Sequence, residues 1–289
     1  MSIPLDQLVE RICKLVLRDW TEGIATGGNT LTLVDTARTE QDDYWNSQNA
    51  EVYIRGGVAA GSTRPINDFV LSTNTLSWLL ATGSIAAGTP YSLHVQFKRD
   101  DVIEAVNSVI DAVARETLVD KIDEASITLV AGRFEYPIPA GFSHLYRLTM
   151  ADAEGEFTNP PIQWDQYKII RGDKPLIHLY SQSDFINVRD HTFGSLWANS
   201  DFTADHKLRL EGYGPQERLI HDNDLCHINP MYVIAQAGAW LHASRIRRAE
   251  NEPDDHRVQA QVWQAIANGL RMNLGGVTQL PPDTRRVVS

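Results

Sequence analysis

The glycine-rich segment at residues 56–63 is the first place in this sequence where residue types could carry chemistry. It reads Gly-Gly-Val-Ala-Ala-Gly-Ser-Thr and superficially resembles a phosphate-binding loop that follows a strand. The lysine that must reach the terminal phosphates is absent, and Ser62 stands in its place. Arg64 and Pro65 follow where that motif requires a helix. The segment therefore predicts a hairpin turn.

Two acidic clusters could be drawn as metal sites. Asp254, Asp255 and His256 are adjacent, but neighbouring residues on a helix point in different directions, and acids in a first turn are ordinary capping groups. Asp222 and Asp224 resemble the start of a calcium loop that lacks its glycine and its closing glutamate. We predict a helix start and a turn, with no metal.

Nucleophilic catalysis has no recognisable motif here. The nine histidines are scattered without an HExxH pair, and no GxSxG or SxxK segment occurs. Cys13 and Cys226 are expected to be reduced core residues, and His242 and Arg245 to be surface or interface groups. Paired carboxylates for glycoside hydrolysis remain open, but no particular pair stands out. We predict no catalytic, cofactor-binding or metal-binding residue, and no enzyme.

Four aromatic residues, Trp45, Tyr53, Trp78 and Tyr91, fall in a β-favouring region. They could form a sugar-stacking surface, but in small β-modules such residues more often form the core. We favour the core.

The composition limits the possible partners. The chain has 289 residues and a formal net charge of −11, which argues against general nucleic-acid binding because phosphate affinity requires a basic surface. No apolar run approaches the roughly 20 residues that cross a bilayer, and the N-terminus does not read as a secretory signal. DNA could still pass such a protein without binding to it.

Helical periodicity marks four segments. Residues 3–18 and 100–119 each carry one apolar stripe, and Asn229 and Pro230 cap a third helix that runs to about residue 249. A fourth helix starts near Pro253, with Val258, Val262, Ile266 and Leu270 expected to form its buried stripe, and stops at residues 275–276, which are both glycine.

Short β-favouring runs fill the rest of the chain. In residues 29–97 they are separated by Gly, Asn, Ser and Thr clusters, which is typical of a small antiparallel sandwich or barrel. We predict an α+β fold: a helical bundle of N-terminal, central and two C-terminal helices, with an inserted β-sandwich or barrel and a second β-rich region. The domains would be a helical core (1–28, 98–125 and 226–274), the β-module (29–97), a β-rich region (126–225) and an extended arm (275–289).

Three stretches resemble the adaptor, or head–tail connector, proteins of tailed bacteriophages. Residues 97–107 are similar to the entry into a helix with an alanine-x-asparagine step. Residues 132–142 are similar to a recurrent "glycine … tyrosine-x-x-proline" strand. Residues 208–213, followed by Leu219, Asp224 and the Asn229-Pro230 helix, are similar to the closing strand and terminal helices. The likeness spreads over most of residues 98–250, and its value lies in order and spacing.

This resemblance implies a non-enzymatic virion protein of the head–tail neck, assembled in the host cytoplasm without a membrane. It would form a homo-oligomeric, dodecameric ring between the portal protein and a tail or tail-completion protein, with genomic DNA passing through without specific binding. The alternatives are a tail-completion or minor tail protein, a glycan-binding module for host attachment that uses residues 29–97, and a hydrolase of unknown type.

Two segments are candidate contacts in such an assembly. The third helix is rich in small residues that let a neighbouring backbone approach closely, and its expected ring-packing residues are Ala235, Gly238, Ala239, His242 and Ala243. The arm cannot form a packed element of its own, so it is expected to be disordered in the free subunit and to order on the portal. Its expected contact residues are Val277, Leu280, Pro281, Pro282, Arg285, Arg286, Val287 and Val288.

Overall fold

The computed structural model describes residues 2–130, 133–152, 154–159, 161–162, 167–179, 206–246, 253–274 and 285–287. They belong to two compact units. The first combines Met1–Ala112 with Arg218–Leu274, and the second combines Val113–Glu217 with Gly275–Ser289. The first unit therefore holds both the helices and the β-module that follows the first helix.

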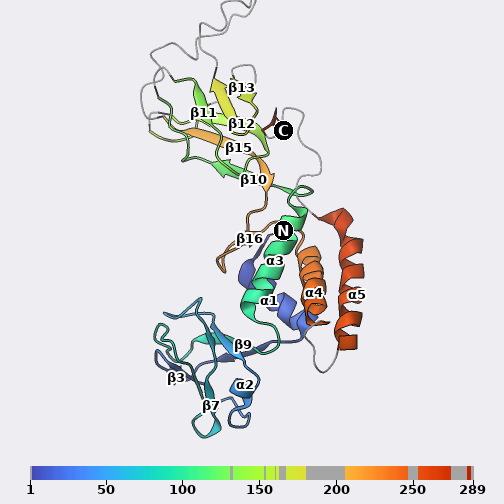
Figure 1. The fold of residues 1–289 in the computed structure, drawn as a ribbon. Coiled ribbons are helices and arrows are strands. Elements are labelled where there is room, and N and C mark those ends of the chain that lie inside the picture. Colours follow the sequence, from blue (N-terminus) through green and yellow to red (C-terminus); the bar gives the residue numbers. More distant parts are fainter. Residues whose placement is uncertain are drawn as a thin grey trace, which may run out of the picture. The chain divides into compact units, whose positions relative to one another are not determined.

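The first unit contains a group of helices (Figure 1). Their bounds are α1 Leu5–Arg11, η1 (a π-helix) Ile12–Leu17, α3 Arg99–Val113, which ends at the start of the second unit, α4 Pro230–Ile246, α5 Pro253–Leu270 and the 3₁₀ turn η4 Arg271–Asn273. The apolar stripe of α3 is buried, as predicted. The side chain of Asn229 accepts a hydrogen bond from the backbone N–H of Met231 at 3.0 Å, which is the predicted cap of α4.

α4 is the central helix of this group. Every residue from Tyr232 to Ala239 is buried, so the helix is enclosed on all sides rather than amphipathic. It packs against α1, η1 and α5. α5 lies beside α4 (Figure 1), and the contact between these two helices is the most extensive in the first unit.

The β-module consists of two four-stranded antiparallel sheets, ordered β2-β9-β5-β6 and β3-β4-β8-β7. Its elements are β2 Thr21–Ile24, β3 Gly27–Gly28, β4 Thr32–Val34, α2 Tyr44–Ser47, β5 Glu51–Ile54, β6 Thr63–Pro65, β7 Asp68–Val70, η2 Leu71–Thr73, β8 Thr75–Ser77 and β9 Pro90–His94. One apolar cluster fills the module, and it includes Leu33, Trp45, Phe69, Leu76 and Leu93. A two-stranded sheet of β1 Ile3–Pro4 and β16 Leu225–Cys226 completes the first unit.

The second unit is built from two antiparallel sheets, ordered β10-β15-β12-β17 and β11-β14-β13. Its strands are β10 Leu118–Asp123, β11 Glu135–Pro137, β12 His144–Met150, β13 Tyr167–Ile170, β14 Leu176–Leu179, β15 Leu208–Pro215 and β17 Arg285–Arg286. The inward residues of both sheets share one core, with Leu145, Leu148, Ile177 and Leu210 among its most buried members.

The predicted helical bundle is wrong. The described residues form 17 strands in five antiparallel sheets beside five α-helices, so the fold is a mixed α+β structure in which β-sheets dominate. Each β-rich segment builds a core of its own instead of covering a helical one. The central helix also ends earlier than predicted, because Leu118–Asp123 pairs with β15 along its whole length, and this tertiary pairing overrides local helix propensity.

Candidate functional site

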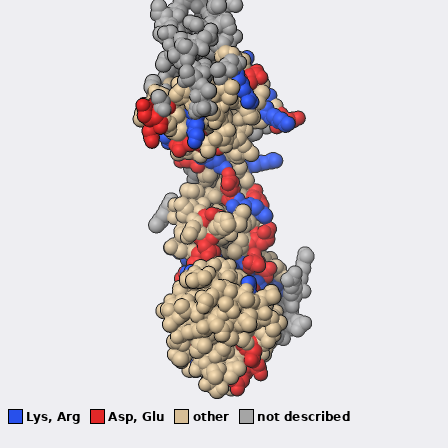
Figure 2. Space-filling view, turned by 90° about the vertical axis from the view of Figure 1, so that its left-hand side faces the viewer, with Lys and Arg blue, Asp and Glu red and all other residues tan. Residues whose placement is uncertain are grey.

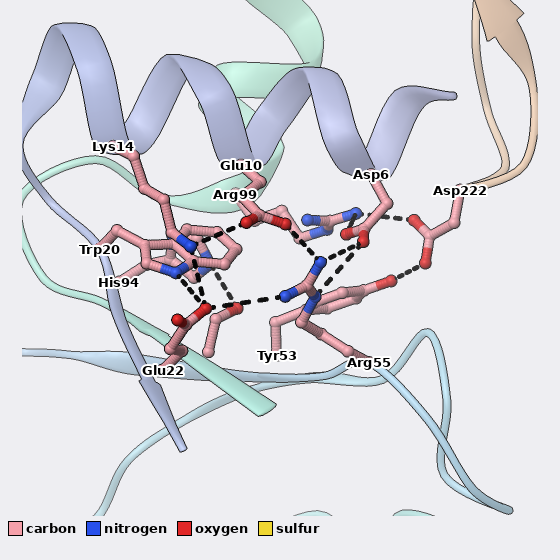
Figure 3. Close-up of polar contacts among 11 residues, drawn as sticks. Asp6, Glu10, Lys14, Trp20, Glu22, Tyr53, Arg55, His94, Arg99 and Asp222 are labelled. Atoms are coloured by element: carbon pink, nitrogen blue, oxygen red, sulfur yellow. Dashed lines mark hydrogen bonds and ion pairs between the residues drawn. The ribbon is translucent and has the colours of Figure 1, made fainter. Parts of the chain in front are cut away.

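A cluster of charged side chains joins α1 and η1 to strands of the β-module (Figure 3). The Arg55 guanidinium on the β-module lies 2.7 Å from Asp6 Oδ2 and 2.7 Å from Glu10 Oε2. Lys14 Nζ lies 2.8 Å from Glu10 Oε1 and 3.1 Å from Glu22 Oε2. Asp6 and Glu10 of α1 thus pair with Arg55 of the β-module, and Lys14 of η1 pairs with Glu22 of β2. These ion pairs hold the helices and the β-module together.

Arg99, at the start of α3, is the most enclosed charge of this cluster. Its side chain is 2% exposed, and its Nη2 donates to Asp222 Oδ1 at 2.6 Å. The guanidinium carbon lies 3.6 Å from the centroid of the Tyr53 ring, and the Tyr53 hydroxyl donates to Asp222 Oδ2. A buried cation stacked on an aromatic face and paired with a carboxylate is a strong structural tie.

The pKa shifts in the cluster favour fixed charges. Burial opposes ionisation of Glu10, but the hydrogen bonds and charges of Lys14 and Arg55 outweigh it and lower the Glu10 pKa. The hydrogen bonds from Trp20 and Lys14 lower the pKa of Glu22. A carboxylate with a lowered pKa is a weaker base and carries no proton to donate at neutral pH, so general acid–base catalysis is not favoured here. We interpret the cluster as a joint between the β-module and the helices.

A serine and a histidine lie side by side next to this joint. Ser92 Oγ and His94 Nε2 are 3.0 Å apart, which is the distance of a nucleophile and its base. Both residues are 0% exposed. Burial, followed by the charges of Arg99, Lys98 and Arg55, lowers the His94 pKa to about 3. A substrate cannot reach this pair, so it is part of the core.

A cleft of about 340 Å³ borders the joint in the first unit. Arg99 and His221 line it together with Asp100 and Asp222. This lining mixes both signs of charge, so it selects neither an anion nor a cation. Among the described residues, no three His, Cys, Asp or Glu side chains are grouped to hold a metal ion.

The motifs singled out in the sequence have ordinary structural roles. Residues 55–62 form the turn between β5 and β6, with Gly57 and Gly61 at positive φ, which confirms the predicted hairpin. Asp224 accepts hydrogen bonds from the backbone N–H groups of Ile220 and His221, which confirms a turn. Asp254 forms an exposed ion pair with Arg257 in the first turn of α5. Both cysteines are free and buried.

The four aromatic residues of the β-module are core residues, as favoured from the sequence. Trp45, Tyr53, Trp78 and Tyr91 are 3%, 2%, 3% and 0% exposed. The Tyr91 hydroxyl donates to buried Asp35 at 2.5 Å. Side chains enclosed in this way offer no ring face to a sugar.

The expected ring-packing helix packs within its own chain instead. Ala235, Gly238, Ala239 and His242 are buried, and only Ala243 is exposed. A Cβ atom on Gly238 would lie 2.3 Å from Val16 Cγ1 of η1. The small residues therefore permit a close approach of η1 to α4, and His242 contacts His256 of α5.

Three residues of the expected arm pair with the chain's own sheet. Arg285 and Arg286 form β17 against β12, where they oppose Leu145 and His144. Val287 is 0% exposed in the core of the second unit. This differs from the expectation of an arm without a packed element, because strand addition occurs within the chain. The other expected contacts, Val277, Leu280, Pro281, Pro282 and Val288, lie outside the described residues.

One face of the β-module is almost free of charge (Figure 2). Residues 69–97 contain no Asp, Glu, Lys or Arg, in a chain whose net charge is −11. Val58, Leu79 and Leu80 are 85%, 78% and 69% exposed on this module. The two loops that carry them are in contact, since a Cβ on Gly83 would meet the backbone of Val58. Depletion of charge around exposed apolar residues is typical of the centre of a protein interface.

A second uncharged surface runs along α5. Val258, Val262 and Ile266 were expected in a buried stripe, but they are 52%, 47% and 38% exposed. Residues four apart lie on one face of a helix, so the three form a line. Residues 258–270 include no charged side chain. The sequence pattern located this stripe correctly but not its environment, because α5 packs on α4 through its other face, where His256 and Ala267 are buried.

Within the described ranges, no helix is both long and apolar enough to cross a bilayer. A comparison of the sequence with protein-family models and with curated proteins finds no match.

Proposed function

We propose that this protein is a non-enzymatic structural subunit of a tailed-phage virion, a ring-forming adaptor that joins the portal to the tail. The order of elements supports the proposal: a first helix, a β-module, a central helix, a second β-rich unit and two terminal helices follow one another. This is the order on which the resemblance to head–tail connectors rests.

The observation that carries the proposal is the exposed apolar stripe of α5. A helix that is buried on one side by α4 and lined on the other by Val258, Val262 and Ile266 suits a subunit that is covered in its assembly. The uncharged face of the β-module offers a second contact surface. The buried state of the Ser92–His94 pair favours a structural role over hydrolysis.

The net charge of −11 suits the proposed passage of DNA through the ring. Acidic subunits repeated around a channel repel the phosphate backbone, so DNA slides without binding. For the arm, the portal contact is proposed for residues 275–284. Val277→Ser with Leu280→Ser, which leaves β17 and Val287 in place, should then weaken assembly onto portal rings.

Negative-stain electron microscopy of the purified protein, alone and mixed with candidate portal protein, tests the proposal. We expect closed rings, or decorated portals, for the wild type and for Ala112→Glu, which adds one charge at an exposed position of α3. Val262→Glu places the same charge in the α5 stripe and should reduce ring formation at least tenfold. A chain that stays monomeric both alone and with portals would refute the adaptor function. Binding to completed tails only would indicate the tail-completion alternative.

A further inference from the structure

Two histidines meet where α5 packs on α4. His242 of α4 and His256 of α5 are 4% and 8% exposed, and their Nδ1 atoms are 3.0 Å apart. The Phe97 ring meets both imidazoles in a T-shaped arrangement, with ring centroids 5.8 and 6.2 Å away. The two imidazoles thus form an enclosed hydrogen bond between α4 and α5, which are also joined by apolar contacts and by the amides of Gln236 and Gln264.

The hydrogen bond requires that one Nδ1 carry a proton and the other not. His242 Nε2 lies 3.4 Å from the carbonyl oxygen of Val16, so it donates there and leaves Nδ1 of the neutral ring as an acceptor. His256 then donates from its own Nδ1. If His242 takes up a second proton, the bond persists only where His256 moves its own proton from Nδ1 to Nε2. Once both rings are protonated, both Nδ1 atoms carry hydrogen at 3.0 Å, and the bond becomes a repulsion.

The surroundings do not neutralise such an added charge. On α4, Arg245 lies over the Phe97 ring at 5.0 Å, and Lys98 precedes α3. From η1, the group that contacts His242 is the uncharged carbonyl of Val16. On α5 the neighbouring acid is Asp255, whose exposed carboxylate is screened by water. Burial, followed by the charge of His256, lowers the pKa of His242, and these effects outweigh the Val16 hydrogen bond.

We propose that the His242–His256 pair is a proton-operated latch that holds the first half of α5 against α4 at neutral pH and releases it in acid. The sign follows from linkage: a released histidine binds protons more readily than the docked one, so docking is complete above the ordinary histidine pKa of 6.5 and weakens as pH falls below it. The second half of α5 lacks this dependence. There the Gln236 and Gln264 amides exchange hydrogen bonds of 2.9 and 3.1 Å, and amides do not titrate.

Hydrogen exchange of the full chain, measured by mass spectrometry at about pH 7.5 and about pH 5 and corrected for intrinsic rates, tests the latch. Peptides from residues 253–262 should lose protection at the lower pH, because release of α5 exposes their amides to exchange. Peptides from β15, in the other unit, should change little. His242→Phe should abolish the pH dependence, because the ring that takes up the proton is then replaced by a neutral one beside Phe97. His221→Gln, at an exposed histidine, serves as the matched control and should leave it intact.

Equal protection at both pH values in the wild type would overturn the latch. So would a pH dependence that survives in His242→Phe, or acid exposure that spreads evenly over the whole first unit. If His242→Phe does not fold, the NMR titration of the wild-type protein decides, because the latch requires the His242 ring to take up its proton below the ordinary histidine pKa of 6.5.

Discussion

Gly238→Ala is the sharpest test of how the helices pack. The added methyl carbon would lie 2.3 Å from Val16 Cγ1, 3.4 Å from Cγ2 and 3.3 Å from Cβ. Non-bonded carbons settle at about 3.5–4.0 Å, so η1 must move by about 1 Å or Val16 must change rotamer. Val16 is β-branched and 4% exposed, which leaves it little room to turn.

Two effects of opposite sign decide the outcome. Overpacking of a close-packed contact costs about 1–3 kcal/mol, and alanine in place of glycine in a helix gains up to about 1 kcal/mol. We expect a net loss of about 1–2 kcal/mol in the free energy of unfolding. Val16→Ala alone removes two buried methyl groups and should cost about 1.6 kcal/mol. In that background Gly238→Ala should become neutral or stabilising, since the clash is gone.

Urea unfolding followed by circular dichroism, with the four variants of this double-mutant cycle, measures these values. Gly269→Ala on α5 is the matched control, because nothing lies within 4 Å of its Cβ position. It should gain about 0.5–1 kcal/mol. A Gly238→Ala protein as stable as the wild type, or one that Val16→Ala fails to rescue, would refute the packing argument and return Gly238 to a role between subunits.

Three further predictions concern other parts of the chain. Arg99→Met removes the buried cation that pairs with Asp222 and should cost about 1–3 kcal/mol in thermal unfolding, because the Asp222 carboxylate is partly exposed to water. Arg218→Met, at an exposed ion pair, should have no measurable effect. Equal effects of the two substitutions would contradict the structural role of Arg99. Burial opposes ionisation of Asp35, but its hydrogen bonds, above all the one from Tyr91, outweigh burial and lower its pKa. The free energy of unfolding should therefore fall as pH drops below 3.8, and Asp35→Asn should flatten that fall in urea titrations. An equally steep fall in Asp35→Asn would contradict this. Val287→Asp places a charge in the core of the second unit and should destabilise that unit by several kcal/mol. Hydrogen exchange of the β12 amides measures this loss. Unchanged protection of β12 would mean that β17 is not a stable strand.

Local patterns predicted many individual elements. The apolar spacing of α1, α3 and α5, the Asn229 cap and most strands of the β-module follow from short stretches of sequence, because helix and strand periods are local properties. The hairpin after β5 was predictable for the same reason: the glycines that permit positive φ and the missing lysine can be read directly from residues 56–63.

The charged joint could not be predicted in the same way. Asp6, Arg55, Arg99 and Asp222 are separated by tens of residues. No local pattern links an acid of α1 to the guanidinium that follows β5. The His242–His256 contact is similar, although both residues were noted individually, because their approach depends on how α5 lies on α4.

The sequence by itself therefore determined the periodic elements, the turns, the acidic charge and the burial of the aromatic core of the β-module. Only the tertiary structure decided which side of an element faces water. The stripe of Val258, Val262 and Ile266 reads as a core stripe in sequence but is exposed, because α4 accepts the opposite face of α5. Likewise Gly238 reads as a subunit contact but meets Val16. Periodicity shows that a helix has an apolar face, while the partner of that face is set by contacts between residues far apart in the chain.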